Sequence, residues 1–231
     1  MPAERRNIVF IVAHPDDVAA AMAGTAHLLA QRYRTHVFCA TQGERGLPGR
    51  DPHETAALRV REEQAACDLL GASLHFLGLM DAEVYAERRV CESLAEELRR
   101  LDPAAAFCQW PLDFHPDHAA TSEIARKALH LSGCKAELYM GETFPGQQTA
   151  NFHPDIYVDV SRLAGVIEAA VRCHVCQNPE DRLLLPALQW RRFRGAEARL
   201  QLAEGFKTLL PSQASSYAVL RDLTGAAPRA A

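Results

Sequence analysis

Short apolar runs of strand length recur along this chain and alternate with stretches in which apolar residues have helical spacing. Six runs are predicted to be strands: residues 7–13, 35–41, 73–79, 104–110, 137–140 and 155–160. Helices are predicted over residues 17–34, 53–71, 86–103, 161–177 and 191–210. Strands that alternate with helices form βαβ units, in which neighbouring strands run parallel. The alternation therefore predicts an α/β chain with a Rossmann-like three-layer fold and a mostly parallel sheet.

The length and the apolar content of the chain favour one domain. A chain of 231 residues with 48% hydrophobic residues is long enough for one α/β domain with a full core. We expect this single domain to span residues 1–223. The small, Ala-rich segment 224–231 is predicted to be a flexible tail.

Charge and cysteine usage exclude several classes of function. The formal net charge is −4 and the charges are mixed, so there is no basic stripe of the kind that binds nucleic acid. The N-terminal apolar run is interrupted by His14 and Asp16 before it could serve as a signal peptide or insert into a membrane. The seven cysteines are scattered and odd in number, which favours reduced thiols. We therefore expect a cytoplasmic protein.

The first motif, "AHPDD", follows the first predicted strand and contains His14, Asp16 and Asp17. In an open α/β sheet, ligands bind beyond the carboxyl ends of the strands, so the active site is expected there. A dinucleotide site would need glycines in this turn, and the carboxylates would repel phosphate. Imidazole and carboxylate groups are good zinc ligands, which favours a metal site. The alternative is a surface turn in which Asp16 or Asp17 caps the following helix.

A second motif, "HPDH" at residues 115–118, follows the fourth predicted strand. Two such turns can approach each other above a parallel sheet, and together they supply enough ligands for a catalytic zinc site with an open position for water. A third His-Pro-Asp sequence, residues 153–155, precedes a predicted strand instead, so His153 is expected to be a loop residue. The pair of motifs therefore predicts one complete metal site.

The two motifs, each placed after a strand, resemble the PIG-L/LmbE-like family of zinc-dependent N-acetylglucosamine deacetylases. This family includes enzymes that deacetylate GlcNAc-phosphatidylinositol and the sugar precursors of mycothiol and bacillithiol. Residues 41–46, 154–160 and 194–206 also look like pieces of the family sequence. The first motif departs from the family at one place, because Val18 stands where glutamate is common.

The resemblance implies a role for each residue of the two motifs. The zinc ligands would be His14, Asp17 and His118, and Fe²⁺ is an alternative to Zn²⁺ because His and Asp suit both. Asp16 would be the general base. His115, as an imidazolium, would face the substrate carbonyl and stabilise the oxyanion or protonate the leaving amine. The Asp117 carboxylate would hydrogen-bond the His115 ring and fix its tautomer. Helix capping stays open as an alternative for both Asp16 and Asp117.

Three more residues are predicted to contact the substrate: Glu44, Arg45 and Glu142. Arg45, Arg50 or Arg59 could pair with an acidic group on the aglycone, although solvation is the favoured interpretation for each arginine alone. The "CHVC" segment at 173–176 lacks a second pair of ligands, so its cysteines are interpreted as structural thiols. The arginines at 191, 192 and 194 could contact a partner subunit or an anionic substrate, or simply coat a helix.

The sequence thus predicts a metal-dependent hydrolase that deacetylates an N-acetylglucosamine-type amino sugar or its conjugate. GlcNAc-malate, GlcNAc-inositol and chitooligosaccharide-like molecules are the substrate types that the resemblance implies. The expected partner is this small molecule, with a homo-oligomer possible by analogy to the family. The alternatives are an amidase that removes a larger acyl group, a non-catalytic metal-binding or carbohydrate-binding protein, and a nucleotide-binding protein.

Overall fold

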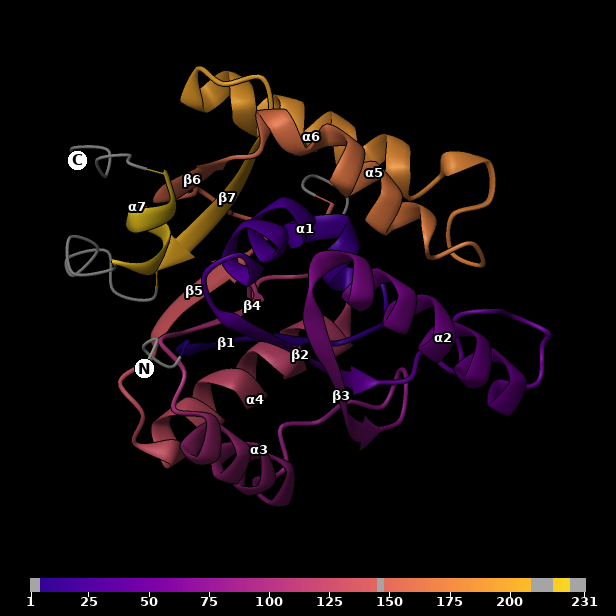
Figure 1. The fold of residues 1–231 in the computed structure, drawn as a ribbon. Coiled ribbons are helices and arrows are strands. Elements are labelled where there is room, and N and C mark those ends of the chain that lie inside the picture. The colour runs from indigo at the N-terminus through magenta and orange to yellow at the C-terminus, as the bar shows by residue number, and fades with distance from the viewer. Residues whose placement is uncertain (1–4, 145–147, 209–217, 225–231) are drawn as a thin grey trace.

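The structure is a computed structural model that describes residues 5–144, 148–208 and 218–224. All of the predicted tail except its first residue lies outside the described residues. The described strands form one sheet in the order β3-β2-β1-β4-β5-β7-β6 (Figure 1). Their bounds are Asn7–Val12 (β1), Arg34–Thr41 (β2), Ala72–Leu79 (β3), Ala105–Gln109 (β4), Glu137–Gly141 (β5), Ile156–Asp159 (β6) and Ala203–Thr208 (β7). Strands β1 to β5 pair in parallel, and β7 runs antiparallel to both of its neighbours. The predicted α/β fold with a mostly parallel sheet is confirmed.

Strand β7 corrects one prediction. Residues 191–210 were expected to form a single helix, but the helix ends at Ala198 and residues 203–208 pair with β5 and β6. The chain leaves the helix at Arg199, which has a left-handed backbone with φ of 61°. Nearly all of β7 is buried, so its apolar residues stabilise the sheet rather than a helix face. The last third of the chain therefore adds β6 and β7 to the sheet, and β7 runs antiparallel to both of its neighbours.

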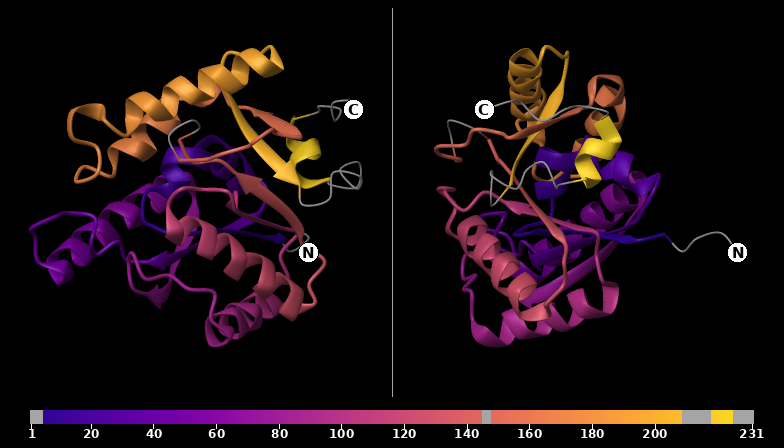
Figure 2. Two further views of the ribbon diagram at one scale, coloured as in Figure 1. Left: turned by 180° about the vertical axis from the view of Figure 1, so that it is seen from behind. Right: turned by 90° about the vertical axis from the view of Figure 1, so that its left-hand side faces the viewer.

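Helices cover both faces of the sheet (Figures 1 and 2). On one face lie α1, α2, α5 and α6, and on the other lie α3 and α4. The helices span Asp17–Ala30 (α1), Pro52–Leu70 (α2), Arg88–Leu101 (α3), Pro116–Ser132 (α4), Ala164–Arg172 (α5), Leu184–Ala198 (α6) and Val219–Thr224 (α7), with short 3-10 helices at Ser161–Leu163 and Pro179–Asp181. Successive side chains of β1 point to opposite faces: Phe10 packs with the α1 layer and Ile11 with the α3 and α4 layer. The molecule thus has three layers with a core on each side of the sheet.

The arginines of α6 have different environments from one another. Arg191 is fully buried and pairs with Glu204 of β7, with 2.7 Å between its Nη2 and the carboxylate. Arg194 is buried against Glu142, whereas Arg192 is exposed. The idea that Arg191 and Arg194 contact a partner subunit or an anionic substrate was therefore wrong, because each already binds an internal carboxylate. They join α6 to the sheet.

The topology selects one position on the sheet for a ligand. From β1 the chain proceeds to β2 and β3 on one side, and later to β4 and β5 on the other side. β1 and β4 are neighbours at this reversal of strand order. In open α/β sheets, ligands bind at such a switch point, beyond the carboxyl ends of the strands. Both His/Asp motifs follow these two strands and therefore meet at this point.

Candidate active site

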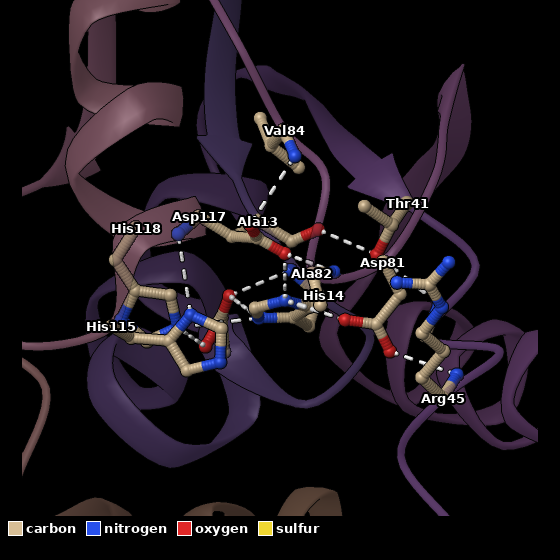
Figure 3. Close-up of polar contacts among 12 residues, drawn as sticks. Ala13, His14, Thr41, Arg45, Asp81, Ala82, Val84, His115, Asp117 and His118 are labelled. Atoms are coloured by element: carbon tan, nitrogen blue, oxygen red, sulfur yellow. Dashed lines mark hydrogen bonds and ion pairs between the residues drawn. The ribbon is translucent and has the colours of Figure 1, made fainter.

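The two motifs bring His14, Asp17 and His118 together at the switch point. Figure 3 shows the two histidine rings side by side. His14 Nδ1 lies 3.3 Å from His118 Nε2, and the latter lies 3.4 Å from Asp17 Oδ1. The other carboxylate oxygen of Asp17, Oδ2, lies 3.7 Å from His14 Nδ1. Ligand atoms about 2.0–2.1 Å from a tetrahedral zinc ion are about 3.3–3.4 Å apart. The donor types and spacings of these three buried side chains therefore fit a divalent cation such as Zn²⁺ or Fe²⁺.

Carboxylates orient the rings of both histidines. His14 Nε2 contacts Asp117 Oδ2 at 3.1 Å and Asp81 Oδ1 at 3.3 Å. His118 Nδ1 lies 3.2 Å from Asp113 Oδ2. Because one nitrogen of each ring faces a carboxylate, the other nitrogen is left facing the candidate metal position. His14, Asp81 and Asp117 could also hold a cation as a group, as could His14 with His115 and His118.

Asp17 is held by two further hydrogen bonds. Its Oδ2 accepts from the side chain of Gln109 at 2.8 Å and from the backbone N–H of His14 at 2.8 Å. Gln109, Asp81 and Asp113 were not predicted from the sequence to support the candidate ligands. A positional signal was present for all three. Gln109 ends the strand β4, Asp81 follows β3, and Asp113 lies two residues before the second motif.

The charges of the cluster are strongly coupled. Burial acts to lower the pKa of His14, but hydrogen bonds to Asp117 and Asp81 outweigh it and raise that pKa to about 10. Burial also acts to lower the pKa of His118, but the charge of Asp17 and the hydrogen bond to Asp113 raise it. Burial would raise the pKa of Asp17, yet the charges of His118 and His14 lower it. A cation at this position would displace protons from the histidines, because metal ligands must be deprotonated.

Asp16 has a different environment from its neighbour Asp17. Its backbone has φ of 104°, and its N–H donates to Glu63 Oε2 at 2.9 Å. Its carboxylate accepts from Arg59 Nη2 at 3.0 Å and makes no capping bond to α1, so the capping alternative is not observed. Burial raises the pKa of Asp16 to about 6 against the opposing charge of Arg59. The side chain lines the cavity beside the three candidate ligands.

His115 lies on the same cavity and stacks on His118, with ring centroids 4.7 Å apart. Its Nδ1 accepts a hydrogen bond from the backbone N–H of Asp117 at 3.3 Å, at the start of α4. The ring nitrogen that accepts has no proton, so the donor is Nε2. Burial and the charges of His14 and His118 lower the pKa of His115. This arrangement favours a neutral ring over the imidazolium that was predicted from the sequence.

The predicted contact between the Asp117 carboxylate and the His115 ring was wrong. That carboxylate bonds His14 and accepts the backbone N–H groups of Ala82 at 2.7 Å and Val84 at 3.3 Å (Figure 3). Burial would raise the pKa of Asp117, but these hydrogen bonds lower it. The backbone of Asp117, rather than its side chain, fixes the tautomer of His115. The carboxylate instead ties the loop after β3 to the candidate ligand His14.

A cavity of about 490 Å³ opens above the site. Its lining includes the predicted residue Arg45 but neither Glu44 nor Glu142. Glu44 Oε1 accepts the backbone N–H of Asp81 at 2.9 Å. Both oxygens of Glu142 accept from the Arg194 guanidinium, at 2.5 and 2.7 Å. Neither residue lines the cavity, so its geometry gives no support to a substrate contact by Glu44 or Glu142, and these contacts stay predictions.

The remaining sequence motifs lie away from this cavity. His153 precedes β6 and is not among the residues that line the cavity, as expected. Cys176 donates to Glu62 rather than joining a metal cluster with Cys173 in the described part of the chain. All seven cysteines are free. Val18 is buried in the core. No helix within the described ranges is long and apolar enough to cross a membrane.

Three known proteins are similar to this chain over much of its length. Diacetylchitobiose deacetylase of Thermococcus kodakarensis is 28% identical over 191 residues, which cover 76% of this chain and 72% of that protein. A probable N-acetyl-alpha-D-glucosaminyl L-malate deacetylase 2 of Bacillus anthracis is 34% identical over 137 residues, which cover 54% of this chain and 59% of that protein. A 4-oxalmesaconate hydratase of Pseudomonas putida is 26% identical over 199 residues, which cover 77% of this chain and 76% of that protein. The relatives thus include deacetylases and a hydratase.

The fold has a counterpart among solved structures. The N,N'-diacetylchitobiose deacetylase from Pyrococcus horikoshii, solved with its inhibitor MPG, superposes with a TM-score of 0.78 at 24% identity. The match covers 91% of this chain and 86% of that chain. The family model described as "PIG-L: GlcNAc-PI de-N-acetylase" matches residues 9–129, just over half of this chain, and includes both His/Asp motifs. On this match, the chain belongs to the PIG-L family.

Proposed function

We propose that this chain is a metal-dependent hydrolase that deacetylates an N-acetylglucosamine-type amino sugar or its conjugate. The observation that carries the proposal is the convergence of His14, Asp17 and His118 beside Asp16 and His115 on one cavity. Two of the relatives bear the names of deacetylases that act on N-acetylglucosamine compounds. A zinc or ferrous ion held by the three ligands would supply a Lewis acid that activates water and polarises the amide carbonyl.

The other residues on the cavity supply proton transfer and orientation. Asp16 is the general base that takes a proton from the attacking water, and Arg59 holds its carboxylate in place. The same carboxyl group then returns this proton to the departing amine. His115 faces the cavity with its Nε2–H, because its Nδ1 accepts from the backbone. That N–H donates to the oxyanion as the carbonyl carbon becomes tetrahedral.

Hydration of a small acid is the second candidate, because one relative is a 4-oxalmesaconate hydratase. A hydratase adds water to a double bond and would use the same base, whereas a deacetylase releases acetate and an amine. A non-catalytic binding protein has no need for a partly buried carboxylate such as Asp16 beside the candidate ligands. An assay of the products therefore distinguishes a hydratase from a deacetylase.

The test is to purify the chain without a metal-binding tag, measure its metal by elemental analysis, and assay acetate and free amine from N-acetylglucosamine conjugates. We expect about one zinc or iron ion per chain, loss of turnover on chelation, and recovery when that metal is restored. Asp16→Asn should keep the metal and lose about 10²- to 10⁴-fold in kcat, as expected for a general base. His118→Ala should lose the metal itself.

Asp68→Asn on the exposed face of α2 is the matched control and should resemble the wild type. Near-normal turnover in Asp16→Asn would remove that residue from the mechanism. Bound metal without amine release from any conjugate, together with water addition to an unsaturated carboxylate, would replace the deacetylase proposal with the hydratase.

A further inference from the structure

One wall of the cavity comes from the segment between α5 and α6. Gln177, Arg182 and Leu183 line the cavity from this segment. The side chain of Gln177 donates to the carbonyl of Gly46 at 3.1 Å, which joins this segment to the loop after β2. Arg45 lines the cavity from that same loop. The two connected segments therefore form a continuous wall beside the candidate ligands.

Three arginines line the cavity, and they differ in their partners. The Arg59 guanidinium bonds the Asp16 carboxylate at 3.0 Å. Arg45 pairs with Glu83, with 2.5 Å between its Nη2 and the carboxylate. Arg182 is exposed to the cavity and, within the ranges that the structure describes, its guanidinium has no hydrogen-bond or ion-pair partner. Arg182 is thus the cation of this wall whose charge is available to a ligand.

The backbone around Arg182 is fixed by other side chains. The carboxylate of the preceding Asp181 is bound by Arg172 at 2.7 and 3.1 Å, so it is not free to neutralise Arg182. Asn178 Oδ1 accepts the backbone N–H groups of Leu183 and Leu184 at 2.9 and 3.0 Å. These bonds hold the segment on both sides of Arg182.

The two residues before Arg182 have unusual backbone conformations. Glu180 has φ of 53° and Asp181 has φ of 58°, which are values that residues other than glycine rarely adopt. Such conformations persist where the surrounding contacts determine them, and they cluster at ligand sites. The segment therefore presents Arg182 from a defined backbone rather than from a random surface loop.

We propose that Arg182 determines the substrate class by binding a carboxylate or phosphate group on the aglycone of the amino sugar. This inference rests on the proposed deacetylase function. A guanidinium stays charged at all relevant pH values and offers paired N–H donors that match these anions. The cavity volume of about 490 Å³ lies in the range of pockets that bury drug-sized ligands, so an aglycone has room beside the sugar.

The experiment compares two N-acetylglucosaminides that differ in one charge: the carboxymethyl glycoside and its neutral methylamide, each as both anomers. We expect the wild type to have a kcat/KM about 10- to 100-fold higher for the carboxylate. Arg182→Gln should remove this preference by raising KM for the carboxylate alone, with kcat and the methylamide reaction unchanged. Arg182→Lys should keep part of the preference, and the exposed Arg192→Gln is the control that should keep all of it.

Equal kcat/KM for the two glycosides in the wild type, or an equal loss on both in Arg182→Gln, would overturn the specificity inference while the deacetylase function stands. If neither glycoside releases amine, the proposed function fails. Calorimetric binding of the deacetylated carboxymethyl glucosaminide then tests Arg182 by itself. At least tenfold weaker binding to Arg182→Gln would support the anion site, and equal binding would overturn it.

Discussion

The buried ion pair between Arg191 and Glu204 connects three elements on the α1 side of the sheet. Both side chains are fully buried. Glu204 accepts the backbone N–H groups of Gly24 and Thr25 in the middle of α1, at 3.0 and 2.8 Å. Arg191 donates to the carbonyl of Ala20 in the same helix at 2.7 Å. The pair therefore holds α6 and β7 against the helix whose first residue is a candidate metal ligand.

We predict that Glu204→Ala destabilises the chain strongly. The substitution leaves a buried guanidinium without its carboxylate and two helix N–H groups without their acceptor. Removing one partner of a buried pair costs about 3–5 kcal/mol. In a chain of this length, each kcal/mol lowers the melting temperature by about 2–4 °C, so the expected loss is about 6–20 °C. Arg191→Met should cost less, because the carboxylate that remains keeps its two helix donors.

The assay is urea unfolding of both single variants and of the Arg191→Met, Glu204→Leu double variant. We expect the double variant to be less destabilised than the sum of the single variants, because neither charge is then left buried alone. Breaking the exposed Arg88–Glu92 pair of α3 is the control and should have no measurable effect. A cost below about 1 kcal/mol for Glu204→Ala, or additive costs in the double variant, would refute this reasoning.

Two further predictions follow from the site and its surroundings. Asp117→Asn should weaken metal binding about 10- to 100-fold, because the carboxylate that orients His14 is lost. Competition with a chelator measures the change in metal affinity. Unchanged affinity would show that Asp81 alone orients the ring. Burial and the Arg59 charge lower the pKa of His174 from 6.5 to about 3, so the unfolded chain takes up a proton that the native chain does not. The stabilisation from neutral His174 is complete above pH 6.5 and is lost as the pH falls toward 3. Relative to His174→Gln, the wild type should therefore lose about 1.4 kcal/mol of unfolding free energy per pH unit between about pH 6 and about pH 4.5. The same dependence of unfolding free energy on pH in both proteins would contradict this prediction.

Most of the sheet was predictable because buried parallel strands are continuous apolar runs. Strand β7 was not, because the helix before it ends at Arg199 in a left-handed conformation. Such helix ends usually have glycine or asparagine, and an arginine gives no signal in the sequence. The predicted helix therefore continued past Ala198, where α6 ends. The position of β7 is determined by its two antiparallel partners, which lie far away in the sequence.

The proximity of the candidate metal ligands was predictable because each motif places them directly after a strand at one edge of the sheet. The partners of the carboxylates were not, because they come from distant segments. Glu142 meets Arg194, which lies 52 residues further along the chain. Asp117 meets His14 and the backbone of the loop after β3. A single sequence indicates that a carboxylate lies near a strand end, but not whether another side chain has already bound it.

The backbone at Asp16 explains how two adjacent aspartates can have separate tasks. A φ of 104° is rare for a residue with a side chain and costs of the order of 1–3 kcal/mol. Glu63 and Arg59 offset this cost, since they bind the N–H and the carboxylate of Asp16. The turn sends the Asp16 side chain toward Arg59 while Asp17, one residue later, faces His118. A glycine would adopt this turn more easily, but it would have no carboxylate to serve as a base. We therefore interpret the strain at Asp16 as the condition that lets one short motif supply both the candidate metal ligand Asp17 and the proposed proton acceptor Asp16.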